Sequence, residues 1–395
     1  MRSIDDYNFR NRKALLRVDF NVPLDDELIV TDETRIIAAI PTIKKIINEG
    51  GSVILMSHLG RPEKGPEDKY SLKHIIPNLQ EKLGIKVKFA GDCLGSLALQ
   101  LSKTLGTGEV ILLENVRFYK EETQGDQHFA IELAKLGDIY VNDAFGTAHR
   151  AHASTTIIAQ FFEDKCAGYI MGSELANAKK VLENPNRPFT AIVGGAKISD
   201  KIMIIERLLD KVDNLIIGGG MSYTFIKAQG GSIGKSLCED DRQAYTLELI
   251  EKAKIKNVNL CLPLDNVIAD DFSNYAKRRI VKSGEIPDDW EGLDIGPKSI
   301  STFQDIIKKS KTILWNGPLG VFEFQNFAIG TEAIAEAVVN ATQNGSFSLI
   351  GGGDSAAAIN NLNYGNKVSY VSTGGGALLE YMEGKTLPGV AILEN

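Results

Sequence analysis

The chain has few cysteines, no long apolar run and no excess of positive charge. Its four cysteines show no CxxC or metal-ligand spacing, which is typical of unpaired thiols in a reducing compartment; they are Cys93, Cys166, Cys238 and Cys261. The first residues contain no apolar stretch of a signal peptide, and no run approaches the roughly 18 apolar residues that span a bilayer. We therefore expect a cytoplasmic protein without a membrane partner.

The composition is that of a soluble α/β protein with two domains. The net charge of −7 argues against nucleic acid as the main partner. A length of 395 residues exceeds what one hydrophobic core usually serves. Apolar, β-branched runs alternate with helix-period segments along the whole chain. This pattern predicts two doubly wound, Rossmann-like parallel-sheet domains joined by a hinge helix.

The first half shows the alternation clearly. Its expected strands are Ala14–Val18, Val53–Met56, Val110–Leu113 and Ile139–Val141, and its expected crossover helices include Thr34–Asn48 and Gln127–Leu136. Prolines at 185 and 188 stop a helical stretch that precedes them, so we place the interdomain linker helix at residues 171–185. The predicted domains are residues 1–170, completed by the tail 383–395, and residues 186–382. The tail segment Leu387–Leu393 is too apolar to remain in water and should dock on the protein.

Four apolar runs in the second half end in glycine pairs or triplets and lead into helix-like segments. They are residues 191–197, 215–221, 349–354 and 370–376. A strand–glycine–helix junction presents backbone N–H groups at the positive end of a helix dipole, where phosphate oxygens bind well. One such junction is weak evidence, because glycine also serves tight turns. Four in one half of the chain predict a nucleotide site.

The strands of the first half end instead in polar side chains. Strand alternation predicts that Arg17, Asp19 and Asn21 share one face. The later strands are followed by His58 and Arg61, by Arg117, and by His149 and Arg150. Each arginine alone has a simpler interpretation as a surface residue. Because ligands bind outside the carboxyl ends of parallel strands, the set together indicates a pocket for a small phosphorylated, carboxylated anion.

Several of these segments resemble the signature segments of the phosphoglycerate kinase family. In the first half the segments are residues 17–23, 58–62, 114–117 and 148–150; in the second half they are residues 194–201, 315–323, 351–354 and 373–376. The resemblance spans the chain in the family's order. It implies that 3-phosphoglycerate binds the first domain at Asp19, Asn21, Arg35, His58, Arg61, Arg117 and Arg150.

The resemblance also assigns the second domain to the nucleotide. It implies nucleotide contacts at Gly194, Lys201, Gly218, Gly292, Asn316, Glu323, Gly351, Gly352, Gly353 and Asp354, and catalytic roles for Arg35, Lys197, Gly352 and Gly375. Glu323 would bind the ribose, Gly218–Gly220 would face adenine, and Asp354 would hold the Mg²⁺ that accompanies ADP or ATP. The choice between ATP and GTP stays open.

Three local expectations concern these nucleotide residues. Lys197 and Lys201 should share one face of a helix that begins after Gly195, with a buried stripe at Ile198, Ile202, Ile205 and Leu209. Asp354 should be a helix N-cap, a magnesium ligand or both. Trp290 and Trp315 should be packing residues rather than stacking platforms.

The implied reaction is reversible phosphoryl transfer between 1,3-bisphosphoglycerate and MgADP. A carboxylate nucleophile is already ionised at neutral pH, so no general base is needed. We expect a monomer in which hinge closure joins the two substrates. The alternatives are an NAD-dependent dehydrogenase, which lacks support because no G-x-G-x-x-G precedes a ribose-binding acid, and a non-catalytic nucleotide-binding protein, which would not need the arginine and histidine set.

Overall fold

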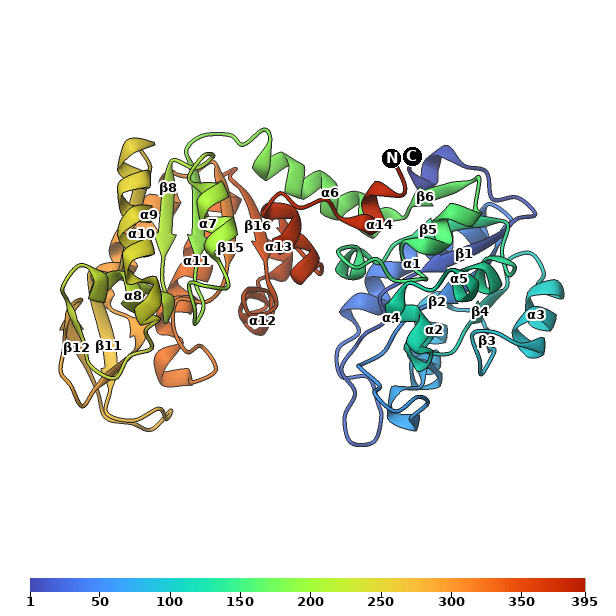
Figure 1. The fold of residues 1–395 in the computed structure, drawn as a ribbon, viewed down its shortest axis with the longest axis horizontal. Helices are drawn as coiled ribbons and strands as arrows, with labels where there is room; N and C mark the ends of the chain where they lie inside the picture. Colours follow the sequence, from blue (N-terminus) through green and yellow to red (C-terminus); the bar gives the residue numbers. More distant parts are fainter. Residues whose placement is uncertain (395) are drawn as a thin grey trace. The chain divides into compact units, whose positions relative to one another are not determined.

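A computed structural model describes residues 1–394 and divides them into two compact units (Figure 1). Unit 1 contains residues 1–176 and returns at residues 385–394, and unit 2 contains Asn177–Gly384. The helix α6, Tyr169–Leu182, includes the first crossing between the units. The assignment of a linker to residues 171–185, with domain limits at 170 and 382, stays a prediction.

Unit 1 is built on a six-stranded parallel sheet. The strand order is β3-β4-β2-β1-β5-β6, in which two of the five neighbouring pairs, β4-β2 and β1-β5, are not consecutive in the chain. In register, Leu15 of β1 lies opposite Ile54 of β2 and Tyr140 of β5. The strands are β1 Lys13–Arg17, β2 Ser52–Met56, β3 Val87–Phe89, β4 Val110–Leu112, β5 Ile139–Asn142 and β6 Lys165–Ala167. The helices are α1 Thr34–Asn48, α2 Ile76–Leu83, α3 Ser96–Lys103, α4 Lys120–Gln124, α5 Gln127–Ala134 and α14 Pro388–Ala391.

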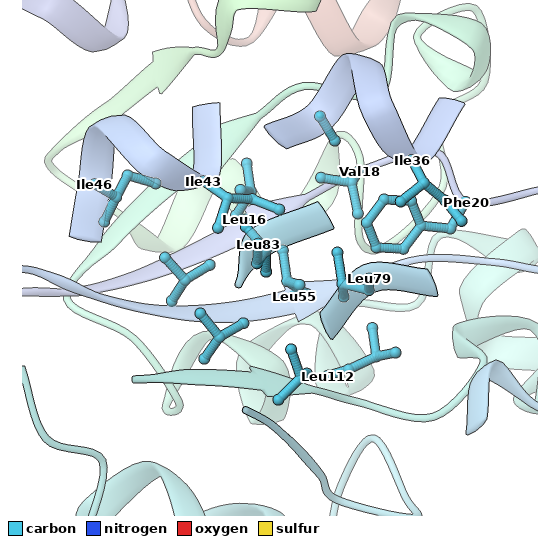
Figure 2. Close-up of a cluster of buried hydrophobic side chains, with 14 of the residues drawn as sticks. Leu16, Val18, Phe20, Ile36, Ile43, Ile46, Leu55, Leu79, Leu83 and Leu112 are labelled. Carbon is cyan, nitrogen blue, oxygen red and sulfur yellow. The ribbon is translucent and has the colours of Figure 1, made fainter. Parts of the chain in front are cut away.

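Side chains at helical spacing along α1 hold this helix on the sheet. Ile36, Ile43 and Ile46 are buried in one cluster with Leu16 of β1 and Leu55 of β2 (Figure 2). The same cluster includes residues of α2 and β4, among them Leu79, Leu83 and Leu112. Burying each such aliphatic side chain contributes about 1.5–3 kcal/mol relative to its exposure. The helix α1 has the bounds that the sequence predicted. Its packing fixes the position of its first turn relative to the sheet.

Unit 2 repeats this plan and adds smaller sheets. Its six-stranded parallel sheet has the order β10-β8-β7-β15-β16-β17. Its strands are β7 Phe189–Val193, β8 Asn214–Ile217, β10 Asn259–Cys261, β15 Thr312–Asn316, β16 Phe347–Gly351 and β17 Tyr370–Val371. An antiparallel sheet, which the sequence pattern did not predict, contains β12 Arg278–Lys282, β11 Asp265–Ala269 and β14 Glu291–Ile295. A short parallel pair joins β9 Ser232–Ile233 to β13 Glu285–Ile286.

The helices of unit 2 cover the six-stranded sheet and frame its glycine-rich edge. They are α7 Ile202–Leu208, α8 Met221–Ala228, α9 Gln243–Ile255, α10 Pro297–Lys309, α11 Ile329–Gln343, α12 Gly353–Asn361 and α13 Gly376–Met382. Trp315 is fully buried in the core beside α10 and α11, and its Nε1–H donates to the carbonyl of Gly317 at 2.8 Å. Trp290 is partly buried with the guanidinium of Arg279 4.4 Å above its ring. Both tryptophans pack as predicted.

Two predicted local structures differ from the fold in a way that affects the site. The strand β1 ends at Arg17, so Asp19 and Asn21 lie in the following loop rather than on a shared strand face. The helix expected after Gly195 begins only at Ile202, and Lys197 and Lys201 precede it. Ile198 is buried in a turn before the helix, which extended the apparent helical periodicity, whereas Ile202 is only half-buried.

The N-cap prediction for Asp354 is also wrong. The cap of α12 is Gly352, whose φ of +93° places it in the left-handed region that favours glycine. Asp354 lies in the first turn of this helix, where its carboxylate still meets the positive end of the dipole.

The apolar tail docks, as expected. The Gly389 N–H of α14 donates to the carbonyl of Ala148 at 2.9 Å, and Leu387 and Leu393 are buried. Within residues 1–394, the helices are too short or too polar to cross a membrane.

Candidate functional site

In unit 1, a group of hydrogen-bonded polar residues lies at the carboxyl ends of β1 and β2. Arg35, in the first turn of α1, donates to the Asp19 carboxylate at 3.0 Å and to the Asn21 carbonyl at 3.1 Å. The Asn21 side chain accepts the Gly60 N–H at 2.7 Å. The loop after β1 is therefore fixed to both α1 and the loop after β2.

His58 lies beneath this group and is almost fully buried. The Nη2 of Arg17, itself fully buried, lies 3.3 Å from His58 Nδ1. Burial, followed by the charges of Arg17, Arg117 and Arg35, holds the pKa of His58 well below its ordinary value. His58 is therefore a neutral imidazole at neutral pH.

Three of the predicted arginines line one cavity of about 620 Å³. They are Arg61, Arg117 and Arg150. The wall also includes Tyr119, Lys120 and the carboxylates of Glu63 and Glu121, so its four cationic side chains outnumber its two carboxylates. Arg117 donates through Nη1 to the Gly60 carbonyl at 2.8 Å, so Gly60 links this cavity to the group around Asn21. The residues that were predicted to bind the acceptor are therefore connected to one another. Three of them line the cavity, and the other four, Asp19, Asn21, Arg35 and His58, lie outside its lining.

The electrostatics of this cavity favour an anion. Burial, and then the charges of Arg17 and Arg150, lower the pKa of Arg117 to about 10. The buried Nε of Arg117 has no hydrogen-bond partner among the described residues. Arg117 is half-buried, and the effects of burial, Arg17 and Arg150 on its pKa outweigh those of Glu122 and Asp19, so an anionic ligand supplies a counter-charge that the protein does not.

In unit 2, three loops meet at the carboxyl ends of the neighbouring strands β7, β8 and β15. The Gly195 N–H donates to the Pro318 carbonyl at 3.0 Å, and the Gly219 N–H donates to the Leu319 carbonyl at 3.2 Å. A Cβ on Gly194 would lie 2.0 Å from the Pro318 oxygen, and one on Gly218 would lie 2.3 Å from the Leu319 side chain. Gly194 therefore excludes any side chain, because the clash is with backbone, whereas a side chain at Gly218 would require Leu319 to move.

These loops border a cavity of about 690 Å³ in unit 2. Its wall combines backbone from Gly195, Gly219, Gly220 and Gly292 with the carboxylates of Glu323 and Asp354 and with apolar side chains that include Leu237, Phe272, Leu293, Val321 and Phe324. An apolar wall with a few polar groups is typical of a small-molecule site, and here it suits a flat base attached to a polar, charged group. Gly292 is required because a Cβ there would lie 2.0 Å from the Tyr223 Oη.

A second group of predicted residues gathers around Asn316, at the end of β15. The Lys201 ammonium donates to the Asn316 side-chain oxygen, and the Asn316 amide donates to the Gly351 carbonyl at 2.9 Å. A Cβ on Gly352 would lie 2.9 Å from the same amide nitrogen. Burial lowers the pKa of Lys201, against the opposing charges of Asp354 and Asp200.

The remaining predicted residues are open to solvent or to empty space. Lys197, Gly353 and Asp354 are exposed, and Gly375, the N-cap of α13, has a φ of +49° and open space where a Cβ would lie. Asp354 fits a magnesium ion that is also held by phosphate oxygens and water, because a single exposed carboxylate on the cavity wall is the usual protein contribution. In the described part of the chain, no cluster of three or more His, Cys, Asp or Glu side chains forms a complete metal cage.

Sequence reasoning did not find the aromatic wall of the unit 2 cavity. Tyr223, Phe272 and Phe324 come from separate segments, and their rings carry no local signal that distinguishes a cavity wall from a core. In unit 1 it also did not find the buried partners of Arg17, which are Ser154 and, through it, Glu122.

The fold and the two cavities are typical of an α/β phosphotransferase with an anion pocket in one unit and a nucleotide pocket in the other. The phosphoglycerate kinase family model matches residues 4–385. The phosphoglycerate kinase of Porphyromonas gingivalis is 53% identical over 417 residues, which cover 99% of this chain and 100% of that protein. The cytosolic phosphoglycerate kinase of Nicotiana tabacum is 51% identical over 393 residues, covering 100% of this chain and 98% of that protein.

Solved structures agree with the sequence relatives. The phosphoglycerate kinase of Coxiella burnetii has a TM-score of 0.90 at 43% identity and covers 100% of this chain and 98% of its own. The phosphoglycerate kinase of Pyrococcus horikoshii OT3 has a TM-score of 0.85 at 29% identity, with the same coverage. The chain belongs to the phosphoglycerate kinase family, and it is an enzyme, a phosphotransferase with a carboxyl group as acceptor. This excludes the dehydrogenase alternative.

Proposed function

We propose that the chain transfers a phosphoryl group reversibly from the acyl phosphate of 1,3-bisphosphoglycerate to MgADP, giving 3-phosphoglycerate and MgATP. The observation that carries the proposal is the cavity in unit 1 lined by Arg61, Arg117 and Arg150. Its cationic wall suits an acceptor that carries both a carboxylate and a phosphate. Unit 2 supplies the glycine-lined cavity for the nucleotide.

In this proposal residues 1–170 with the tail 383–395 form the acceptor domain. Arg61, Arg117 and Arg150 bind the anionic groups of 3-phosphoglycerate, and neutral His58 contributes a hydrogen bond. Arg35 meets the reacting carboxylate and the phosphoryl group. Asp19 and Asn21 orient Arg35, an inference that their contacts of 3.0 and 3.1 Å support.

Residues 186–382 form the nucleotide domain. The backbone at Gly218–Gly220 and Gly292 faces the base, and Glu323 accepts hydrogen bonds from the ribose hydroxyls. Gly194, Lys201, Asn316 and the triplet Gly351–Gly353 contact the phosphates. Asp354 would hold Mg²⁺, which when bound neutralises charge on the phosphate oxygens.

The residues of the chain act by position and charge. The carboxylate of 3-phosphoglycerate is ionised at neutral pH, so no side chain has to remove a proton. Arg35, Lys197 and the N–H groups of Gly352 and Gly375 stabilise charge on the equatorial oxygens of the transferred group.

Transfer also requires the two substrates to meet. We propose closure about a hinge helix at residues 171–185 and the segment Glu383–Pro388, which would exclude water from the acyl phosphate. Small-angle scattering with and without both substrates measures this directly. A radius of gyration that is the same in both samples contradicts closure.

We propose in addition that the enzyme is a cytoplasmic monomer. The cytosolic relative from Nicotiana tabacum supports the location, and the absence of CxxC spacing among the four cysteines is consistent with a reducing compartment. Sedimentation equilibrium tests the monomer, and a dimer mass at micromolar protein would contradict it.

The decisive experiment is MgATP-dependent phosphorylation of 3-phosphoglycerate by the purified chain, with acetate and carbamate as parallel acceptors. We expect rapid turnover with 3-phosphoglycerate alone, because acetate and carbamate carry no phosphate for the arginine-lined cavity. Equal turnover with acetate would contradict the role of that cavity. MgADP binding without turnover on any acceptor would contradict the proposed reaction.

A further inference from the structure

A fully buried carboxylate lies behind the arginine cluster of unit 1. Glu122, on the short helix α4, is 0% exposed. Its Oε1 accepts the Ser154 hydroxyl at 2.7 Å, and its Oε2 accepts the Ser154 N–H at 2.8 Å. A buried charge is tolerated only when it is paired and hydrogen-bonded, so this geometry has a cost that a purely apolar core would avoid.

The Ser154 hydroxyl connects Glu122 to Arg17. Because the hydroxyl proton is directed at Glu122, its oxygen is left to accept the Arg17 Nε–H at 2.8 Å. Arg17 also donates through Nη1 to the Val18 carbonyl. With Nε and Nη1 both held, the plane of the guanidinium is fixed, and Nη2 is placed 3.3 Å from His58 Nδ1.

The direction of this last contact determines where the proton of His58 resides. A guanidinium carries donors and no acceptor, so His58 Nδ1 must be the acceptor. A neutral imidazole carries one proton, and here it must be on Nε2. Asp19 Oδ1 lies 3.8 Å from the same Nδ1, too far to compete with the Arg17 contact.

We propose that Glu122 and Ser154 are positioning residues for the acceptor site, and that through Arg17 they hold His58 as the Nε2–H tautomer, the hydrogen-bond donor that the proposed function requires of it. His58 is 3% exposed and lies outside the lining of the cavity. We name Glu122, Ser154, Arg17 and His58 the Glu122 relay. The inference rests on the proposed function for the identity of the substrate, but the tautomer of His58 does not depend on it.

Charge explains why a relay is useful at this place. An unconstrained imidazole could turn a lone pair toward an anion, which would repel it. The burial that keeps His58 neutral also prevents it from becoming a double donor by protonation. Fixing one tautomer leaves a donor for the anion without adding another charge to a cluster that already contains Arg17, Arg117 and Arg35.

The experiment measures the tautomer and the kinetics of the same variants. Two-bond ¹H–¹⁵N correlation spectra of the full-length protein distinguish Nε2–H from Nδ1–H imidazoles, and the signal of His58 is assigned from its loss in His58→Gln. We expect an Nε2–H pattern in the wild type and a mixed pattern in Ser154→Ala and Glu122→Gln. The KM for 3-phosphoglycerate should rise roughly tenfold, as expected for one weakened hydrogen bond to a charged group, while the KM for MgATP stays constant.

Three comparisons separate this relay from a merely structural role of Glu122. Glu132→Gln removes a carboxylate from a half-buried residue that pairs with the exposed Lys135 and should change neither readout. Because Ser154 is the link, the effects of Glu122→Gln and Ser154→Ala should be less than additive in the double variant. If Glu122→Gln does not fold, Ser154→Ala decides the question alone.

The contrary outcomes are distinct. An Nδ1–H pattern in the wild type overturns the relay, as do folded variants that lose thermal stability but keep the wild-type tautomer and both KM values. A wild-type protein with the Nε2–H pattern but no activity on 3-phosphoglycerate contradicts the proposed function and still supports the tautomer assignment.

Discussion

The two cavities differ in the part of the chain that forms them. The cavity of unit 1 is lined mainly by long polar side chains, of which Arg117 is held by the Gly60 carbonyl, and the fully buried Arg17 outside the lining is held by Ser154. The cavity of unit 2 is lined largely by backbone and apolar side chains, and its glycines allow loops to approach within distances that a Cβ would not permit. Truncation should therefore damage the first cavity, whereas addition of a methyl group should damage the second.

The largest effect should come from removing one charge that acts on the transferred group in each unit. We expect Arg35→Ala and Lys197→Ala each to lower turnover about 10²–10³-fold, the usual penalty for one preorganised charge-stabilising group. Steady-state kcat with saturating 3-phosphoglycerate and MgATP measures it. Turnover close to wild type in either variant would show that this residue is not catalytic. It would also contradict the expectation that each unit contributes one such charge.

A single methyl group should give the next largest effect, and only in unit 2. In Gly292→Ala the new Cβ meets the buried Tyr223 Oη, which accepts a hydrogen bond from Asn266 at 3.3 Å and cannot easily move. Overpacking of this kind costs about 1–3 kcal/mol, so the KM for MgADP should rise roughly tenfold to a hundredfold while that for 3-phosphoglycerate is unchanged.

The control for this variant is its combination with Tyr223→Ala, which removes the Oη, Cζ and Cε1 atoms that lie 2.0, 2.3 and 2.8 Å from the new Cβ and should restore part of the affinity. Gly106→Ala, in unit 1, adds a Cβ that makes only an ordinary contact 3.5 Å from Glu109 and should have no effect on nucleotide binding. Similar losses in all three proteins would show that the defect is not local.

The stabilities of the two units should respond to pH with opposite sign. Burial raises the pKa of Asp294, in unit 2, to about 7, so the folded state binds a proton that the unfolded state releases between its ordinary pKa and 7. Stability from this group is therefore lost as the pH rises. In unit 1, burial lowers the pKa of His152 to about 4, so its contribution is present above the unfolded pKa and is lost as the pH falls toward 4.

Urea unfolding of Asp294→Asn and the wild type at pH 5 and pH 7 measures the first half of this contrast. The difference in free energy of unfolding, variant minus wild type, should be larger at pH 7 than at pH 5 by on the order of 2 kcal/mol. A difference between the two proteins that does not depend on pH would mean that Asp294 is not protonated in the folded state.

The smallest effect should come from a histidine outside the acceptor set. All five histidines lie in unit 1, but His128 is exposed on α5. We expect His128→Ala to change the free energy of unfolding by less than about 0.5 kcal/mol and to leave both KM values unchanged. A large kinetic effect would indicate that the acceptor site extends further than the cavity described above.

Long, strongly patterned elements were predictable from the sequence, and the junctions that carry chemistry were less so. The helix Thr34–Asn48 has the predicted bounds, and four strands of unit 1 match within one residue, because burial on both faces gives continuous apolar runs. The segment around Lys197 was wrongly predicted as helix, because Ile198 is buried by tertiary contacts and has the spacing of a helical face.

The residues that line the site were predictable from the sequence, but the buried residues that hold them in place were not. Strand ends gave Arg61, Arg117 and Arg150, since parallel strands bring their carboxyl ends to one edge. The contacts of Ser154 and Glu122 join residues 32 positions apart in the chain, and those of Arg17 and Ser154 join residues 137 apart. No local periodicity of the sequence indicates such pairs, because only the fold brings these residues together.

The return of the chain to unit 1 has a consequence for synthesis. Residues 385–394 follow all of unit 2 in the chain, yet they belong to unit 1. Gly389 of α14 donates its N–H to the Ala148 carbonyl, and Leu387 and Leu393 on either side of α14 are buried. During translation the ribosome therefore releases every residue of unit 2 before unit 1 receives its last apolar cover. Unit 1 is encoded first and completed last, so the Ala148 carbonyl lacks its Gly389 partner throughout the synthesis of unit 2.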